Sequence, residues 1–210
     1  MNDHEHVENV PLIEDSLALD LANTHYTVRG AVREGLASPS ALDGWLQRIR
    51  PRLTHTPASE ALVVGEGDLA EFLALRSAIR SIAGSLAAAD SGDGAAGERA
   101  VDEAAVDLLN AHAGILRTWQ SLALSIGSVP SAVSRSEGSG VGGVLGEIAA
   151  DAIAIFGTDR LTTLRACQAP GCPLFFLKDH PRREWCRPSC GTRVRAARAY
   201  RKRTGLVVED

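Results

Sequence analysis

Four cysteines are the residues of this chain best suited to carry chemistry. Four residues separate Cys167 from Cys172, three separate Cys186 from Cys190, and thirteen lie between the two pairs. The chain has no other cysteine. Two short pairs joined by a segment of hairpin length can fold as two knuckles that present four thiolates to one tetrahedral Zn²⁺ ion. Because four thiolates complete the coordination sphere, the spacing predicts one structural zinc and not a catalytic one.

Two disulfides, or four unconnected buried thiols, are the alternatives to zinc. Disulfides require an exported protein, whereas the first residues, Met1 to Glu8, are acidic and contain no apolar signal run. This favours the reducing cytoplasm. Unconnected thiols would not be confined to two short pairs. His180 is a fifth candidate ligand, but it lies in the predicted turn between the pairs, so we expect the four cysteines to bind the metal.

The segment between the pairs predicts a β-hairpin. Leu174 to Leu177 is an apolar strand, Lys178 to Arg183 is a polar turn, and the segment that ends at Trp185 is the returning strand. The aromatic side chains of this segment would form its small core: Phe175, Phe176 and Trp185. A structural zinc contributes on the order of 10 kcal/mol or more to the folding of a module of this size.

Positive charge is concentrated around and after the cysteines. The whole chain has a formal net charge of −4, yet the segment from Arg165 to Arg203 holds eleven basic and two acidic residues. No acidic residue occurs from Gly191 to Gly205. A solvated helix normally mixes acids among its bases, so this all-basic helix indicates phosphate binding. The candidate nucleic-acid contacts are Arg183, Arg187, Arg193, Arg195, Arg198, Arg201, Lys202 and Arg203.

These residues resemble the C-terminal zinc finger of the bacterial CGNR family. The resemblance is carried by the first cysteine pair, by Arg183 ahead of Trp185-Cys186, and by Cys190-Gly191-Thr192-Arg193, where Thr192 replaces the family's Asn. In that family the finger follows an N-terminal ABATE domain, and Leu17-Ala-Leu-Asp20-Leu-Ala-Asn23-Thr24 is similar to the signature near its start. The resemblance implies a treble-clef-like module that binds DNA in a stress-induced transcription regulator.

The preceding residues predict mainly helices. Leu17 to Thr24 favours a short helix, in which Asp20 and Asn23 are expected to satisfy local backbone donors, with pocket lining left open. Ser38-Pro39 starts a second helix that Pro51 ends. Its apolar face comprises Leu42, Trp45, Leu46 and Ile49. Three further helices are predicted over residues 68–89, capped by Asp68, over 98–113, and over 144–156.

Other features of this part favour structural roles. Arg76 and Arg80 lie one helical turn apart on the flank of the 68–89 helix, and we expect a solvated face there in preference to an anion site. Inward positions of the next helix are predicted at Val101, Ala105, Leu108 and Leu109, with His112 at the edge of the core. Residues 119–126 alternate as a strand that pairs with 131–135. The glycine-rich stretch through Gly143 lacks the Lys-Ser/Thr of a phosphate loop.

The sequence thus predicts a mainly α protein with a small β element. We expect a disordered acidic lead over 1–11, an ABATE-like domain over 12–160, and a zinc finger with a basic helix over 161–205. The predicted function is a DNA-binding transcription regulator of the bacterial cytoplasm, whose N-terminal domain senses a signal or mediates assembly. Expected partners are double-stranded DNA and an unknown small-molecule effector, and a homodimer is left open.

Membrane association and catalysis are not expected. No apolar run is long enough to cross a membrane. The histidines are scattered, and neither Gly-x-Ser-x-Gly nor His-Glu-x-x-His occurs, so the chain is predicted not to be an enzyme. Two alternatives to the regulator stay open: an RNA-binding protein, and a protein-interaction adaptor that uses the zinc finger as a docking surface.

Overall fold

The computed structural model describes residues 10–56, 60–88, 101–124 and 129–204. Helices outweigh strands in this part of the chain, and its strands form three two-stranded antiparallel sheets. The predicted fold class is therefore confirmed. The elements in chain order are α2 (Leu17–Ala22), β1 (His25–Val28), β2 (Ala31–Glu34), α3 (Pro39–Ile49), α4 (Glu66–Ala88), α5 (Glu103–Ala113), β3 (Arg117–Ala123), β4 (Ser131–Glu137), α6 (Gly140–Phe156), β5 (Leu164–Ala166), β6 (Phe175–Leu177) and α7 (Pro188–Thr204).

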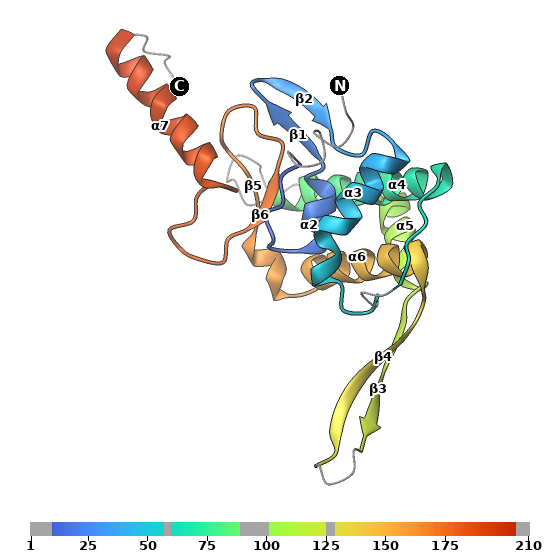
Figure 1. Cartoon of the computed structure of the whole chain (residues 1–210). Helices are drawn as coiled ribbons and strands as arrows, with labels where there is room; N and C mark the ends of the chain where they lie inside the picture. Colours follow the sequence, from blue (N-terminus) through green and yellow to red (C-terminus); the bar gives the residue numbers. More distant parts are fainter. Residues whose placement is uncertain (1–9, 57–59, 89–100, 125–128, 205–210) are drawn as a thin grey trace.

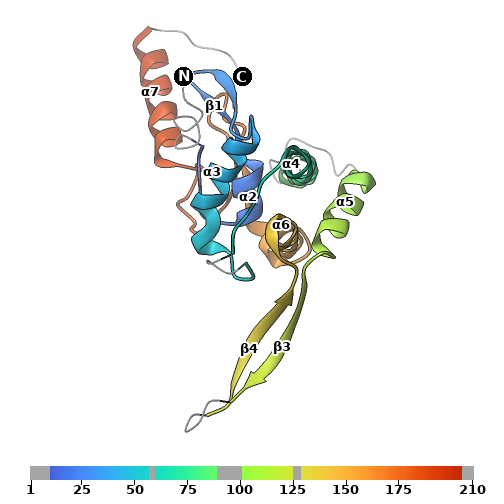
Figure 2. The same ribbon diagram turned by 45° about the vertical axis from the view of Figure 1, so that its right-hand side comes forward.

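Helix α2 lies at the centre of the N-terminal part, packed against α4 and α6 (Figures 1 and 2). All six of its residues are buried. A helix buried on every side has no polar face, which is why its sequence lacks the amphipathic period of a surface helix. The Ser16 side chain caps the helix by accepting a hydrogen bond from the Leu19 amide at 3.2 Å. The helix predicted here is confirmed.

Helix α3 follows its prediction closely. Ser38 caps it by accepting from the Ala41 amide, and Pro39 occupies the first turn, where a missing N–H costs nothing. The four residues predicted to face the core are fully buried. Trp45 meets Phe72 of α4 edge to face, with ring centroids 6.1 Å apart. The α-helix ends at Ile49, just before Pro51, and a 3-10 turn follows directly over Arg50–Arg52.

Helix α4 begins at Glu66, two residues before the predicted start. The carboxylate of Asp68 accepts from the Gly65 amide at 2.8 Å, so it caps from inside the first turn and not from the position before it. In α5, Asp102 accepts from the Ala104 amide. Ala105, Leu109 and His112 are buried as predicted, while Val101 and Leu108 are half-buried against the core. Residues 98–100 of the predicted helix lie outside the described residues.

Helix α6 begins at Gly140, four residues earlier than predicted, and ends at Gly157 as expected. Its glycines serve close packing. A Cβ at Gly146 would lie 2.7 Å from the Leu116 Cβ and 3.2 Å from the His112 carbonyl oxygen. A Cβ at Gly143 would lie 3.0 Å from the Gly138 carbonyl. The glycine-rich stretch therefore lets α6 approach the end of α5 and the base of the β3–β4 hairpin, which lies between the two helices in the chain.

Strands β3 and β4 form a hairpin that extends away from the helices (Figures 1 and 2). Its register runs from Arg117 opposite Glu137 to Ala123 opposite Ser131. The predicted pairing is confirmed, although residues 125 and 126 of the predicted strand lie outside the described residues. Both faces of the hairpin meet solvent, and its exposed apolar side chains include Trp119, Leu122 and Leu124.

The hairpin predicted between the two cysteine pairs is wrong in its second strand. Strand β6 pairs instead with β5, which precedes the first cysteine, and Leu164 lies opposite Leu177. After Leu177 the backbone bonds within tight turns, since the Asp179 amide donates to Leu177 and the Arg183 amide donates to His180. Pro181 in this segment has no N–H for a ladder, and segment 164–166 supplies the partner strand instead.

Three further points complete the fold. Residues 10 and 11 of the predicted disordered lead are buried, and the Val10 carbonyl accepts from Arg48 at 2.9 Å, so the lead joins the core there. Residues 1–9 lie outside the described part. Helix α7 extends from the zinc module away from the body (Figure 1). None of the helices among the described residues combines the length and apolarity that crossing a membrane requires.

Candidate metal centre and nucleic-acid interface

The four cysteine sulfurs converge on one point. Their Sγ atoms all lie within 4.8 Å of one another. The Cys172–Cys186 and Cys172–Cys190 separations are both 3.7 Å, and Cys186–Cys190 is 3.5 Å. A tetrahedral zinc with Zn–S bonds of about 2.3 Å requires sulfur separations of about 3.8 Å. The four thiols therefore form a site that can hold one zinc ion, as the spacing predicted.

Local backbone geometry builds each knuckle. In the first, the Cys172 amide donates to the Ala169 carbonyl at 2.9 Å, and Gly171 adopts a φ of +68°, which a side chain would disfavour. The Cys167 amide donates to Leu174, which closes the loop onto β6. In the second, the Cys190 amide donates to the Arg187 carbonyl, where α7 begins. Both turns leave the thiols on the inner side.

The thiols already polarise one another. Hydrogen bonds from the Cys172 and Cys186 side chains lower the pKa of Cys167 to about 2. The same bond to Cys167 raises the pKa of Cys172 to about 11, and bonds to Cys167 and Cys172 also raise the pKa of Cys186. Zinc binds cysteine as the thiolate, so metal affinity depends on pH.

His180 does not take part in this site. It is exposed, and its Nδ1 accepts from the Arg182 amide at 3.1 Å within the turn. The metal-binding group found among the described residues contains the four cysteines alone. The choice of thiolates over His180 as ligands agrees with this geometry.

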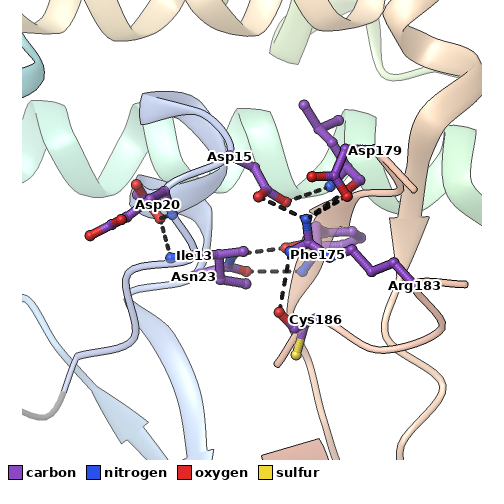
Figure 3. Close-up of polar contacts among 10 residues, drawn as sticks. Ile13, Asp15, Asp20, Asn23, Phe175, Asp179, Arg183 and Cys186 are labelled. Carbon is purple, nitrogen blue, oxygen red and sulfur yellow. Dashed lines mark hydrogen bonds and ion pairs between the residues drawn. The ribbon is translucent and has the colours of Figure 1, made fainter. Parts of the chain in front are cut away.

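Asn23 joins the N-terminal part to the zinc module. Its side-chain amide donates to the Phe175 carbonyl and its oxygen accepts from the Phe175 amide, both at 2.9 Å (Figure 3). Asn23 is fully buried. The expectation of a local backbone cap is therefore wrong for Asn23, which bonds a strand 152 residues away. The signature residue aligns β6 against the end of α2.

Asp20 does satisfy local backbone donors, as predicted. Its Oδ1 accepts from the Ile13 amide at 2.7 Å and from the Glu14 amide at 3.2 Å. Its other oxygen forms an ion pair with Arg52. Burial is the main influence on its carboxyl group and raises the pKa, against the opposing effect of Arg52. Asp20 thus fixes the segment that enters α2.

Arg183 is held between the two parts of the protein. Its Nη1 contacts Asp15 at 2.9 Å and Asp179 at 3.2 Å, and it also donates to the Leu177 carbonyl (Figure 3). Its Nη2 donates to the Cys186 carbonyl at 3.3 Å. Burial opposes its charge, but the bonds to Asp15 raise the pKa above its ordinary value. The structure gives this candidate nucleic-acid contact a second role, which orients the module.

Arg76 and Arg80 correct a prediction, because neither forms a solvated face. Arg76 is 8% exposed and binds both carboxylate oxygens of Glu34 at 2.5 and 2.6 Å. Arg80 donates to the Ala22 carbonyl at 2.8 Å, and its guanidinium lies 5.5 Å from the centre of the Phe175 ring. Arg76 therefore pairs with the exposed Glu34 of β2, and Arg80 binds the end of α2. Their position beside the apolar stripe of α4 hints at burial, but it does not identify these partners.

Helix α7 packs against the zinc module near its start. Cys190, Gly191 and Val194 are buried, and a Cβ at Gly191 would lie 2.8 Å from the Trp185 ring. Beyond them the side chains that follow are mostly exposed, including the predicted packing residue Tyr200 at 55%. The basic residues on its exposed surface are Arg193, Arg195, Arg198, Arg201, Lys202 and Arg203. Six predicted contacts therefore share one outward-reaching helix.

A cavity of about 470 Å³, lined by both polar and apolar side chains, lies in the N-terminal part. Asp15 and Ser16, ahead of α2, line one side. Glu147 and Asp151 of α6 line another, and both carboxylates accept from backbone amides. Asp15 also binds the Leu177 amide of the zinc module at 2.9 Å (Figure 3). Asp15 therefore connects the cavity directly to the zinc module.

Comparison with known families matches nearly all of this architecture. Residues 15–159 match the model of the ABATE family, which is described as "Putative stress-induced transcription regulator". Residues 163–203 match the model of the CGNR zinc finger. No curated protein matches the chain.

Proposed function

We infer the function from two facts: this chain belongs to the ABATE family, and it carries a CGNR zinc finger. The family supports the coarse function, a transcription regulator. We propose that the regulator binds double-stranded DNA through the zinc module, in the cytoplasm of a bacterium that responds to stress. The families matched are a regulator and a zinc finger, which gives no support to a catalytic role.

The observation that carries this proposal is the surface of α7. Its exposed side chains include six cationic residues, and no carboxylate occurs along the helix. Such a surface costs energy through mutual repulsion unless phosphates approach it, and each neutralised phosphate releases condensed counterions. The zinc site holds the start of the helix, and its later turns extend away from the body, where they can lie along a groove of the duplex (Figure 1).

The first experiment measures binding of the zinc-loaded chain to a pool of genomic duplexes. We expect a shared site to be enriched, and log K to fall with log salt with a slope of roughly −4 if about four phosphates are contacted. The Arg195→Ala/Arg198→Ala double variant should keep its zinc and reduce the steepness of that slope by about 2. Arg117→Ala, on the distant β3, is the matched control and should bind as the parent does.

Two outcomes would redirect the proposal. Retention of single-stranded RNA over duplex DNA would make the helix an RNA-binding element. Binding of neither nucleic acid, with zinc content and folding intact, would leave the adaptor function, in which the basic helix docks on an acidic protein surface. If the parent does bind duplex DNA, an unchanged affinity in the Arg195→Ala/Arg198→Ala variant contradicts the assignment of these two arginines.

The N-terminal domain is proposed to sense a signal through the 470 Å³ cavity. Asp15 supports this role because it both lines the cavity and binds Arg183 and Leu177. An occupant that contacts Asp15 would therefore change how the module is held. A panel of amino acids, polyamines and sugars can be screened by thermal shift. A hit should lose its effect in Ala150→Trp, which fills the cavity, and a hit that survives this change binds elsewhere.

A further inference from the structure

A basic cleft lies where the β1–β2 hairpin meets the two zinc knuckles. Its volume is about 290 Å³. One wall is the turn of the hairpin, and the other walls are the first knuckle and the start of α7. Three arginines line it, with no Asp or Glu: Arg29, Arg187 and Arg193. Two of the zinc-binding cysteines, Cys172 and Cys190, also line the cleft, so it adjoins the metal centre. The cleft thus combines residues from both family domains.

Arg29 occupies a backbone position that the turn does not favour for arginine. Arg29 and Gly30 both have positive φ, at 51° and 82°, which is the conformation of a two-residue hairpin turn. Asn, Asp and Gly are the usual first residues of such turns, because they tolerate the left-handed region. The exposed Arg29 departs from that preference, so its side chain serves something other than the turn.

Arg187 brings a donor that the described residues leave without a partner. Its Nε is buried and has no hydrogen-bond partner among them. Burying a charged donor without a partner is costly, whereas an oxyanion in the cleft would accept from it. The hydroxyl group of Ser189 lines the same cleft and can donate as well.

Arg193 shows the competing explanation for this charge. Its Nη2 lies 3.6 Å from the Cys190 sulfur, so it offsets charge at the metal centre. A zinc tetrathiolate has a net charge of about −2, and the three arginines could serve that purpose alone. Arg29 can separate the two explanations, because it belongs to the N-terminal hairpin. It lines the cleft together with Cys172 and Cys190, but the hydrogen bonds of the described residues include one from Arg193 to a cysteine and none from Arg29.

We propose that this cleft binds one phosphate group, with Arg29 as a ligand from the N-terminal domain. The occupant is a phosphate of the DNA backbone, and this identification rests on the proposed function. The interface then extends from α7 across the zinc knuckles to the β1–β2 turn. A phosphorylated small molecule offers the same chemistry, and a separate arm of the test distinguishes it.

The test compares Arg29→Asn with Arg33→Asn. Asn suits the positive φ at position 29, so the turn is kept. Arg33 is exposed on β2 of the same hairpin but does not line the cleft, which makes it the matched control. We expect Arg29→Asn to weaken duplex binding about five- to tenfold and to reduce the steepness of the salt slope by about 1, equally for all sequences. Arg33→Asn should behave as the parent.

A second arm uses calorimetry with inorganic phosphate and pyrophosphate and no DNA. Heat of binding that disappears in Arg29→Asn, with duplex affinity unchanged, assigns the cleft to a free phosphorylated ligand. If Arg29→Asn matches Arg33→Asn in both arms, the phosphate site is refuted and the arginines only offset the zinc thiolates. Failure of the parent to bind duplex DNA refutes the proposed function, while the calorimetric arm still tests the cleft.

Discussion

At the scale of single residues, Asn23 is the side chain that bonds both backbone groups of a strand in the zinc module. Its amide pairs with both backbone groups of Phe175, and it is fully buried. Asn23→Leu leaves an amide and a carbonyl without partners, so we expect a loss of about 2–4 kcal/mol in the free energy of unfolding. Urea denaturation of the zinc-loaded protein measures it. Asn110→Ala, at an exposed position of α5, should change stability by less than about 0.5 kcal/mol.

Glu34 gives a prediction on pH. Burial raises its pKa, but hydrogen bonds from Arg76 and the Leu36 amide outweigh burial and hold the pKa below its ordinary value of 4.5. A depressed carboxyl pKa adds stability that is present above pH 4.5 and is lost as the pH falls through the folded-state value. In a carbon-13 titration, the Glu34 carboxylate should therefore protonate below pH 4.5. Removing its partner by Arg76→Ala should raise that midpoint, and an unmoved midpoint would contradict the assignment.

At the scale of elements, two helix glycines should respond to replacement by alanine with opposite changes in stability. A Cβ at Gly146 in α6 would lie 2.7 Å from the Leu116 side chain and 3.1 Å from the Leu116 backbone nitrogen. Gly146→Ala should therefore destabilise the protein by about 1–3 kcal/mol. A Cβ at Gly84 in α4 meets nothing within 4 Å, so Gly84→Ala should gain up to about 1 kcal/mol from helix propensity. Thermal denaturation of the two variants checks both signs, and a shared sign would reject this packing of α6.

Elements also show what a sequence can and cannot predict. The zinc ligands and α3 depend on spacing and caps within a few residues, so the sequence alone was sufficient for them. The partner of β6 was misassigned because β5 and the segment after Leu177 are both close along the chain, and only Pro181 and the local turns decide between them. The roles of Asn23 and Arg80 depend on Phe175, which is distant along the chain, and no local pattern encodes that contact.

At the scale of the whole molecule, the two family domains share one core. Buried residues form a continuous cluster that includes Leu19 of α2, Phe176 of β6 and the cysteines of the knuckles. The polar contacts of Asp15, Asn23 and Arg80 lie along the same boundary. A zinc finger joined by a flexible linker would unfold independently of the N-terminal domain. Here the packing couples the module to α2 and α4.

Removal of zinc should therefore weaken the N-terminal domain as well as the finger. Chelation removes a contribution on the order of 10 kcal/mol or more from the module, and Cys172→Ser weakens the same site. The loss of β6 then exposes Asn23 and the end of α2. We expect a single thermal transition with zinc and a lower one without it, measured by calorimetry. Hydrogen exchange should speed up at Phe175 and Leu177 and also at Leu19 of α2, whereas the β3–β4 amides, remote from the module, should keep their rates. Unchanged protection at Leu19 after chelation would show that the domains fold independently, and Asp15 could then not transmit a signal between them.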